Sequence, residues 1–175
     1  MKIVLKKYWQ IFLIAAVIVV LDQWTKTLVR TNILPGESWL PESLLWLSPY
    51  ARIVHWYNTG AAFGMFKDAS MILTVLAFVV IGAILFYYPQ VDQGDWLLRL
   101  ALSLQLGGAL GNLIDRLTIG HVTDFVSVGN FPVWNIADAS ITIGAVVLFL
   151  DVWLRERAEK RTGKPVDVQG ETTGE

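Results

Sequence analysis

"SMILTVLAFVVIGAILFYY", Ser70–Tyr88, is apolar along its length and carries no charged side chain. A helix needs about 20 mostly apolar residues to cross a bilayer, so this run has the properties of a membrane span. The whole chain agrees, since 54% of its residues are hydrophobic and 17% are charged, against roughly 25% charged residues in a soluble domain. The sequence therefore predicts a polytopic membrane protein.

Three other runs have similar length and composition. The expected spans are 8–28, 70–88, 96–114 and 136–154. The first follows "MKIVLKK", which resembles the basic start of a secretory signal peptide. However, "LDQWTK" follows the apolar run where a small-residue cleavage site would be needed, so we interpret it as a retained span.

Lysine and arginine near the span ends predict the orientation, because these residues concentrate in cytoplasmic segments. They cluster before the first span and after the last one: Lys2, Lys6, Lys7, Arg155, Arg157, Lys160, Arg161 and Lys164. Both termini are therefore expected in the cytoplasm. The net charge of −1 makes nucleic acid an unexpected partner, and the absence of cysteine excludes disulfides, thiolate metal sites and a cysteine nucleophile.

The segment 29–69 is too long for a simple connector. "ARIVHWYN" is rich in β-branched and aromatic residues, as strands are, and "GAAFGMF" has the composition of a short interfacial helix that could form a lid. The expected fold is an all-α membrane protein: a bundle of four transmembrane helices with a small extracytoplasmic β-element and a short amphipathic helix. Residues 1–160 form this single domain, and 161–175 form a polar, disordered cytoplasmic tail.

Charged residues inside spans are rare and usually face the bundle interior. Asp22 and Lys26, near the outer end of the first span, have the i,i+4 spacing of a helical ion pair. A structural pair that orients this helix end is the simpler interpretation, and direct catalysis is the alternative.

The third span ends in "GGALGNLIDR", which contains a GxxxG pattern from Gly107 to Gly111 that permits close helix packing. Asn112 and Arg116 share one face and are expected to point inward at the outer end of the bundle. An ordinary interhelical hydrogen bond explains them equally well. Asp115 is expected to pair with an arginine or lysine at the interface.

Two aspartates flank the loop between the third and fourth spans, and Asn135 lies three residues before the second as a candidate N-cap. If the loop brings Asp124 and Asp138 together, they would share a proton and supply a general acid and a general base at once. Such a pair can activate water against an amide without a metal. Alternatively, the two acids cap separate elements and never meet, or they bind a metal with His121.

Five blocks identify a resemblance. They are "DQWTK" (22–26), "NTGAAFG" (58–64), "GGALGNLIDR" (107–116), "GHVTDF" (120–125) and "NIADAS" (135–140). In this order and spacing the chain resembles the lipoprotein signal peptidases, the signal peptidase II family of bacterial membrane proteases. The resemblance implies an aspartic endopeptidase that removes the signal peptide from diacylglyceryl-modified prolipoproteins, cutting just before the lipidated cysteine.

The resemblance also implies roles for individual residues. Asp124 and Asp138 match the family's catalytic pair, and no metal or cofactor is expected. The matching substrate-binding or supporting positions are Asn58, Gly60, Ala61, Asn112, Arg116, Asn135, Asp22 and Lys26. The implied protein is a multi-pass protein of the bacterial cytoplasmic membrane, with its active site near the outer face and membrane lipid around it. Inhibition by the cyclic peptide globomycin is expected, and a monomer is sufficient.

Three other functions remain as alternatives. A proton or cation transporter would need acids through the depth of the spans, whereas spans 70–88 and 136–154 lack midplane charge. A Ser–Lys protease would need a serine beside Lys26, for which Ser70, Ser103 and Ser140 are the candidates. A non-enzymatic scaffold would leave both aspartates dispensable.

Overall fold

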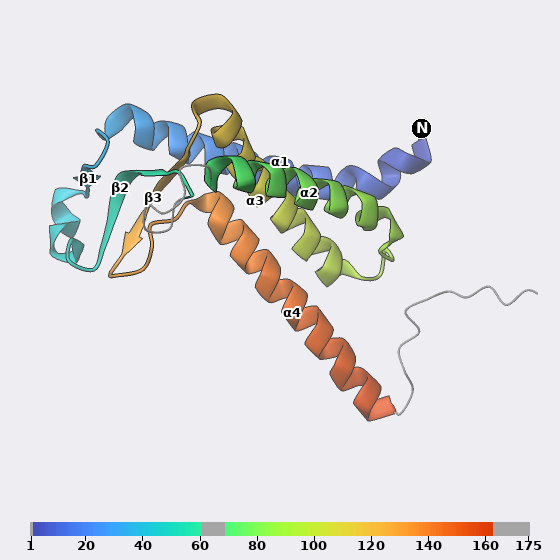
Figure 1. Cartoon of the computed structure of the whole chain (residues 1–175). Coiled ribbons are helices and arrows are strands. Elements are labelled where there is room, and N and C mark those ends of the chain that lie inside the picture. Colours follow the sequence, from blue (N-terminus) through green and yellow to red (C-terminus); the bar gives the residue numbers. More distant parts are fainter. Residues whose placement is uncertain (1, 61–68, 163–175) are drawn as a thin grey trace, which may run out of the picture.

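The computed structural model describes residues 2–60 and 69–162, which form four long helices and one small antiparallel sheet (Figure 1). The helices are α1 (Lys2–Asn32), α2 (Ala69–Tyr87), α3 (Trp96–Ile119) and α4 (Ile136–Thr162). The strands are β1 (Ser38–Trp39), β2 (Ala51–Asn58) and β3 (Val122–Val128). Two short 3-10 helices are η1 (Glu42–Leu47) and η3 (Tyr88–Gln90). The predicted class, a four-helix membrane bundle with a small β-element, is confirmed.

All four long helices are long and apolar enough to cross a membrane. The stretches that meet this requirement are Tyr8–Asn32, Ser70–Gln90, Trp96–Ile119 and Ile136–Ala158. Each stretch continues a few residues past the expected span end.

Helix α3 lies at the centre of the bundle. In its most apolar window 61% of the residues are buried, against 6% for α2, and it packs against each of the other three helices. Glycines make this possible, because a methyl group at Gly107 would lie 2.8 Å from Cβ of Ile18 on α1. A methyl group at Gly108 would overlap the backbone of Ala137 on α4. Gly111 is equally crowded, since a methyl group there would lie 2.7 Å from Oδ2 of Asp22, so the close packing predicted for the Gly107–Gly111 pattern is present.

The sheet has the order β1-β2-β3, and both strand pairs are antiparallel. The strand predicted from "ARIVHWYN" is β2, which pairs with β3 through Trp56 and Asp124 and carries a register shift between Ile53 and Trp56. Helix α3 ends at Ile119 and is capped by Gly120, whose φ of 79° is left-handed and favours glycine. This turn sends the chain directly from α3 into β3.

The sheet lies at one end of the bundle, where α1 and α3 end and α4 begins, and we call this the sheet end (Figure 1). The start of α1 and the end of α4 lie at the opposite end. The expected amphipathic lid helix, "GAAFGMF" at 60–66, lies outside the described residues apart from Gly60. Helix α4 continues to Thr162, into the expected polar tail, and 163–175 also lie outside the described residues.

Candidate active site

Asp124 lies in β3, opposite Trp56 of β2, and only 1% of it is exposed. Its Oδ2 accepts a hydrogen bond from Nδ2 of Asn58 at 2.8 Å, and its Oδ1 accepts one from Nδ2 of Asn135 at 2.6 Å. Burial raises the pKa of Asp124 to about 6, against the lowering effect of the Asn58 hydrogen bond, and the charge of Asp138 raises this pKa further. Asp124 therefore holds a proton more readily than an ordinary aspartate.

Asp138 occupies the third position of α4 and is half-buried. Its backbone N–H donates to Oδ1 of Asn135 at 2.9 Å, and the backbone N–H of Asn135 donates to Oδ2 of Asp138 at 3.3 Å. This reciprocal pair is a capping box with Asn135 as the N-cap. The cap holds the carboxylate of Asp138 at the first turn of the helix.

Asn135 and Asn112 join the two acids into one network. Asn135 donates its side-chain amide to Asp124 while it caps the helix that carries Asp138. Asn112 on α3 donates Nδ2 to Oδ1 of Asp138 at 2.7 Å and accepts at Oδ1 from Nδ2 of Asn135 at 3.2 Å. The structure thus brings Asp124 and Asp138 to one place, which disagrees with the alternative of two separate caps.

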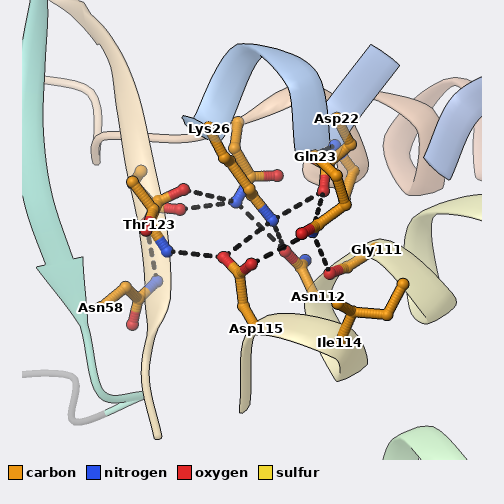
Figure 2. Close-up of polar contacts among 12 residues, drawn as sticks. Asp22, Gln23, Lys26, Asn58, Gly111, Asn112, Ile114, Asp115 and Thr123 are labelled. Carbon is orange, nitrogen blue, oxygen red and sulfur yellow. Dashed lines mark hydrogen bonds and ion pairs between the residues drawn. The ribbon is translucent and has the colours of Figure 1, made fainter. Parts of the chain in front are cut away.

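A buried ionic cluster around Lys26 adjoins this network through Asn112 (Figure 2). The Nζ atom of Lys26 lies 2.8 Å from Oδ2 of Asp22, which is the predicted i,i+4 ion pair, and 3.2 Å from Oδ2 of Asp115. It also donates to Oδ1 of Asn112 at 3.0 Å. All four side chains are buried, and the Lys26–Asn112 bond links the cluster directly to the network of the two acids.

Asp115 pairs with basic residues, as expected, and it is completely buried. Its Oδ1 lies 3.2 Å from Nη1 of Arg30, and its Oδ2 accepts the backbone N–H of Thr123 at 3.0 Å. Because Thr123 directly precedes Asp124, this bond attaches the catalytic candidate's strand to α3.

Gln23 contributes to the cluster and is absent from the predicted site residues. Its Nε2 lies within hydrogen-bonding distance of Oδ1 of Asp115 at 3.1 Å, the backbone oxygen of Gly111 at 3.0 Å and Oδ2 of Asp22 at 3.2 Å. A usable signal existed in the sequence, because Gln23 precedes Lys26 by three residues and so shares its helix face.

A groove opens beside Asp138 between α2, α3 and α4, with a volume of about 290 Å³. Its polar end is formed by Asp138, Asn112 and the half-buried Arg116. The remaining lining is mostly apolar: Leu73, Leu76, Ala77, Val80, Gln105, Ala109 and Ile141. Arg116 thus faces the groove, as its predicted inward position requires.

Asn58 also shapes the chain that follows it. Its Oδ1 accepts the backbone N–H of Gly60 at 2.8 Å, and Gly60 has a left-handed φ of 79°. Ala61, the next predicted site residue, lies outside the described residues. His121, the third ligand of the metal alternative, packs its ring against Tyr57 with 4.2 Å between ring centroids.

Comparisons with known proteins agree with one another. A family model described as signal peptidase (SPase) II matches residues 14–154. The lipoprotein signal peptidase of Shouchella clausii is 38% identical over 154 residues, covering 86% of this chain and 97% of that protein. The lipoprotein signal peptidase of Moorella thermoacetica is 39% identical over 136 residues, covering 78% of this chain and 87% of that protein.

Two solved structures of bacterial membrane enzymes share the fold, each with a TM-score of 0.73. The first is 27% identical, and the match covers 95% of this chain and 93% of the solved chain. The second is 30% identical, and the match covers 82% of this chain and 92% of the solved chain. Since the family model spans most of the sequence and several relatives above 30% identity cover more than two thirds of it, the chain belongs to the signal peptidase II family.

Proposed function

We propose that this protein is a membrane aspartic endopeptidase that removes the signal peptide from diacylglyceryl-modified prolipoproteins and cuts just before the lipidated cysteine. Family membership supports a protease of prolipoproteins in a bacterial membrane. The observation that carries the aspartic mechanism is the network in which Asn135 contacts both Asp124 and Asp138.

In the proposed reaction one carboxylate takes a proton from water as the water oxygen attacks the scissile carbonyl carbon. The other carboxyl group, protonated, hydrogen-bonds the carbonyl oxygen as the centre becomes tetrahedral. The C–N bond then breaks, and the proton taken from water passes to the leaving nitrogen. The raised pKa of Asp124 supports this scheme, because a pair of this kind needs one member that retains a proton.

The groove beside Asp138 supports a lipid-modified substrate. Its lining is apolar along α2 and polar at Asp138, Asn112 and Arg116. An apolar signal helix or acyl chain can remain against α2 or in the bilayer while the peptide bond reaches the carboxylates. This geometry supports the proposed cleavage next to the lipidated cysteine, because that residue joins the lipid to the peptide.

The charge distribution supports the proposed orientation. Arg155, Arg157 and Lys160 lie near the end of α4, away from the sheet end. By the positive-inside rule this end faces the cytoplasm, together with both termini, and the sheet end with its two acids faces outward. One chain carries all of the proposed catalytic groups, so a monomer is sufficient. We also propose that globomycin-type cyclic peptides inhibit the protein by occupying this site.

The Ser–Lys alternative receives no support from the described residues. The three candidate hydroxyls donate to backbone carbonyl oxygens: Ser70 to Gly120, Ser103 to Arg99 and Ser140 to Leu104. Lys26 is occupied by two carboxylates and an amide oxygen. A lysine held as a buried cation in this way is a poor general base.

The test compares the wild type with Asp124→Asn and Asp138→Asn, purified in detergent. Each is given a diacylated prolipoprotein and its unlipidated form, and the products are located by mass spectrometry. We expect the wild type to cleave the lipidated form before the modified cysteine and both variants to be inert though folded. Asp92→Asn is the matched control, since Asp92 is exposed in the link between α2 and α3. Near-normal turnover in either active-site variant would refute the aspartate mechanism.

A further inference from the structure

The side-chain amide of Asn112 has a defined orientation. Its Oδ1 accepts from Nζ of Lys26 at 3.0 Å and from Nδ2 of Asn135 at 3.2 Å, while its Nδ2 donates to Oδ1 of Asp138 at 2.7 Å. Rotating the amide by half a turn would set its NH2 group against an ammonium and another amide NH2. It would also turn its oxygen toward a carboxylate oxygen. Lys26 therefore opposes this rotation strongly, because its positive charge requires an oxygen at that place.

Lys26 is itself held in position. An ammonium group has three N–H donors, and its three contacts are Asp22, Asp115 and Asn112. The two carboxylates are fully buried and bound to other elements, Asp22 to the backbone N–H of Ala137 and Asp115 to that of Thr123. The third donor consequently has a fixed direction, which is toward Oδ1 of Asn112 (Figure 2).

We propose, resting on the function proposed above, that Lys26 is a positioning residue that holds the Asn112 amide with its NH2 toward Asp138, and so keeps Asp138 as the carboxylate that takes the proton from the attacking water. An N–H group directed at a carboxylate oxygen favours its charged form, whereas a carbonyl oxygen there would favour the protonated acid. Asp138 also receives the backbone N–H of Asn135 in the first turn of α4. Asp124 accepts two N–H donors as well, but it is 1% exposed, whereas Asp138 is half-buried in the first turn of a helix, where a negative charge is favoured. Asp124 is therefore the member that retains the proton, which agrees with its raised pKa.

Other charges surround Asp138 in the described residues. Helix α1 supplies Asp22 and Lys26, helix α3 supplies Asp115 and Arg116, and β3 supplies Asp124. Helix α2, on the far side of the groove, has no charged residue. Substitution of Lys26 alters both the net charge of these surroundings and the direction of the Asn112 amide. The test therefore needs a second variant that keeps the net charge and changes only the N–H donor facing Asp138.

Asn112→Leu is that variant, because Lys26 and its ion pairs remain, the net charge is unchanged and the N–H donor facing Asp138 is removed. The measurement is kcat and KM for a diacylated prolipoprotein between about pH 4.5 and 8.5, where the acid limb of kcat reports protonation of the base. We expect the midpoint of this limb to move up by about one pH unit. Lys26→Met should move it in the same direction with a lower kcat and little change in KM. Lys26→Arg, which keeps a cationic donor, should restore the wild-type midpoint.

A merely structural role for Lys26 would reduce the amount of folded enzyme and leave the midpoint unchanged. An unmoved midpoint in Asn112→Leu, or in folded Lys26→Met, overturns the proposal. Lys26→Met leaves the buried carboxylate of Asp22 without its cation. If that variant does not fold, the double variant Asp22→Asn with Lys26→Met removes this unpaired charge, and Asp22→Asn alone is its control. If that also fails to fold, the Asn112→Leu midpoint decides. Asp124→Asn and Asp138→Asn are assayed in parallel. Turnover in either of them refutes the proposed function. If both are inert while the Asn112 and Lys26 variants keep the wild-type midpoint, this inference alone is refuted.

Discussion

Oδ1 of Asp22 accepts the backbone N–H of Ala137 at 2.9 Å, so a side chain of α1 caps the first turn of α4. The first N–H groups of a helix have no partner within the helix, and here a buried carboxylate supplies one. The other oxygen of Asp22 binds Lys26 at 2.8 Å. A single carboxylate thus joins the first and last helices one residue before Asp138.

This relationship predicts that Asp22→Ala strongly destabilises the fold. The substitution leaves Lys26 without one of its two buried carboxylates and the N–H of Ala137 without an acceptor. Breaking a buried ion pair costs on the order of 3 kcal/mol, so we expect a loss of this size in the free energy of unfolding, measured by tryptophan fluorescence in detergent. Asp92→Ala, at an exposed aspartate, is the control. Equal effects of the two changes would contradict the prediction.

Gly111→Ala tests the close approach of α3 to α1 and α4. A methyl group at this position would lie 2.7 Å from Oδ2 of Asp22 and 3.2 Å from Cβ of Ala137. Because both neighbours are tied into the buried network, we expect a loss of about 1–3 kcal/mol in unfolding free energy together with reduced turnover. Gly82→Ala on α2 is matched, since a methyl group there meets nothing within 4 Å. That control should leave stability unchanged or slightly raised.

The pKa of Asp124 predicts a pH dependence of stability. Its folded-state pKa of about 6 exceeds the ordinary value of 3.8, so the folded protein binds this proton more tightly than the unfolded chain does. The ionised group therefore costs stability above about pH 6, and this cost disappears as the pH falls through 6 toward 3.8. Asp124→Asn does not titrate. Between about pH 7 and pH 4 we expect the wild type to gain up to about 3 kcal/mol relative to the variant, measured as unfolding free energies at several pH values. Parallel curves for the two proteins would disprove the assignment.

Ala77→Trp tests the groove as the substrate path. Ala77 lines the groove on α2, and an indole there would fill much of its volume of about 290 Å³. We expect KM for a diacylated substrate to rise about tenfold or more, as a clash of 1–2 kcal/mol would produce, with little change in folding. Val79→Trp is the matched control, because Val79 is 61% exposed on the same helix and does not line the groove. If the control raises KM as much as Ala77→Trp does, the groove is not the path.

The sequence alone was sufficient for the class of fold, because a membrane span is decided by local composition. Ser70–Tyr88 is apolar whatever its neighbours are, and Asp22 and Lys26 share a helix face through their spacing alone. The order of five motifs was sufficient for the family. The same motifs named Asp124 and Asp138, and the structure places both acids in one network, while their catalytic role remains a proposal.

Tertiary structure decided which groups contact the two acids. Asp115 binds the N–H of Thr123, and Gln23 reaches Asp115 across 92 residues of sequence. Which end of the Asn112 amide faces Asp138 depends on Lys26 from another helix. Hydrophobicity acts on each segment by itself, so it can be read along the chain, whereas a buried hydrogen bond depends on distance and angle between segments. The spans were therefore predictable from the sequence, and the direction of each buried polar group was established only when α1, α3, α4 and β3 packed together.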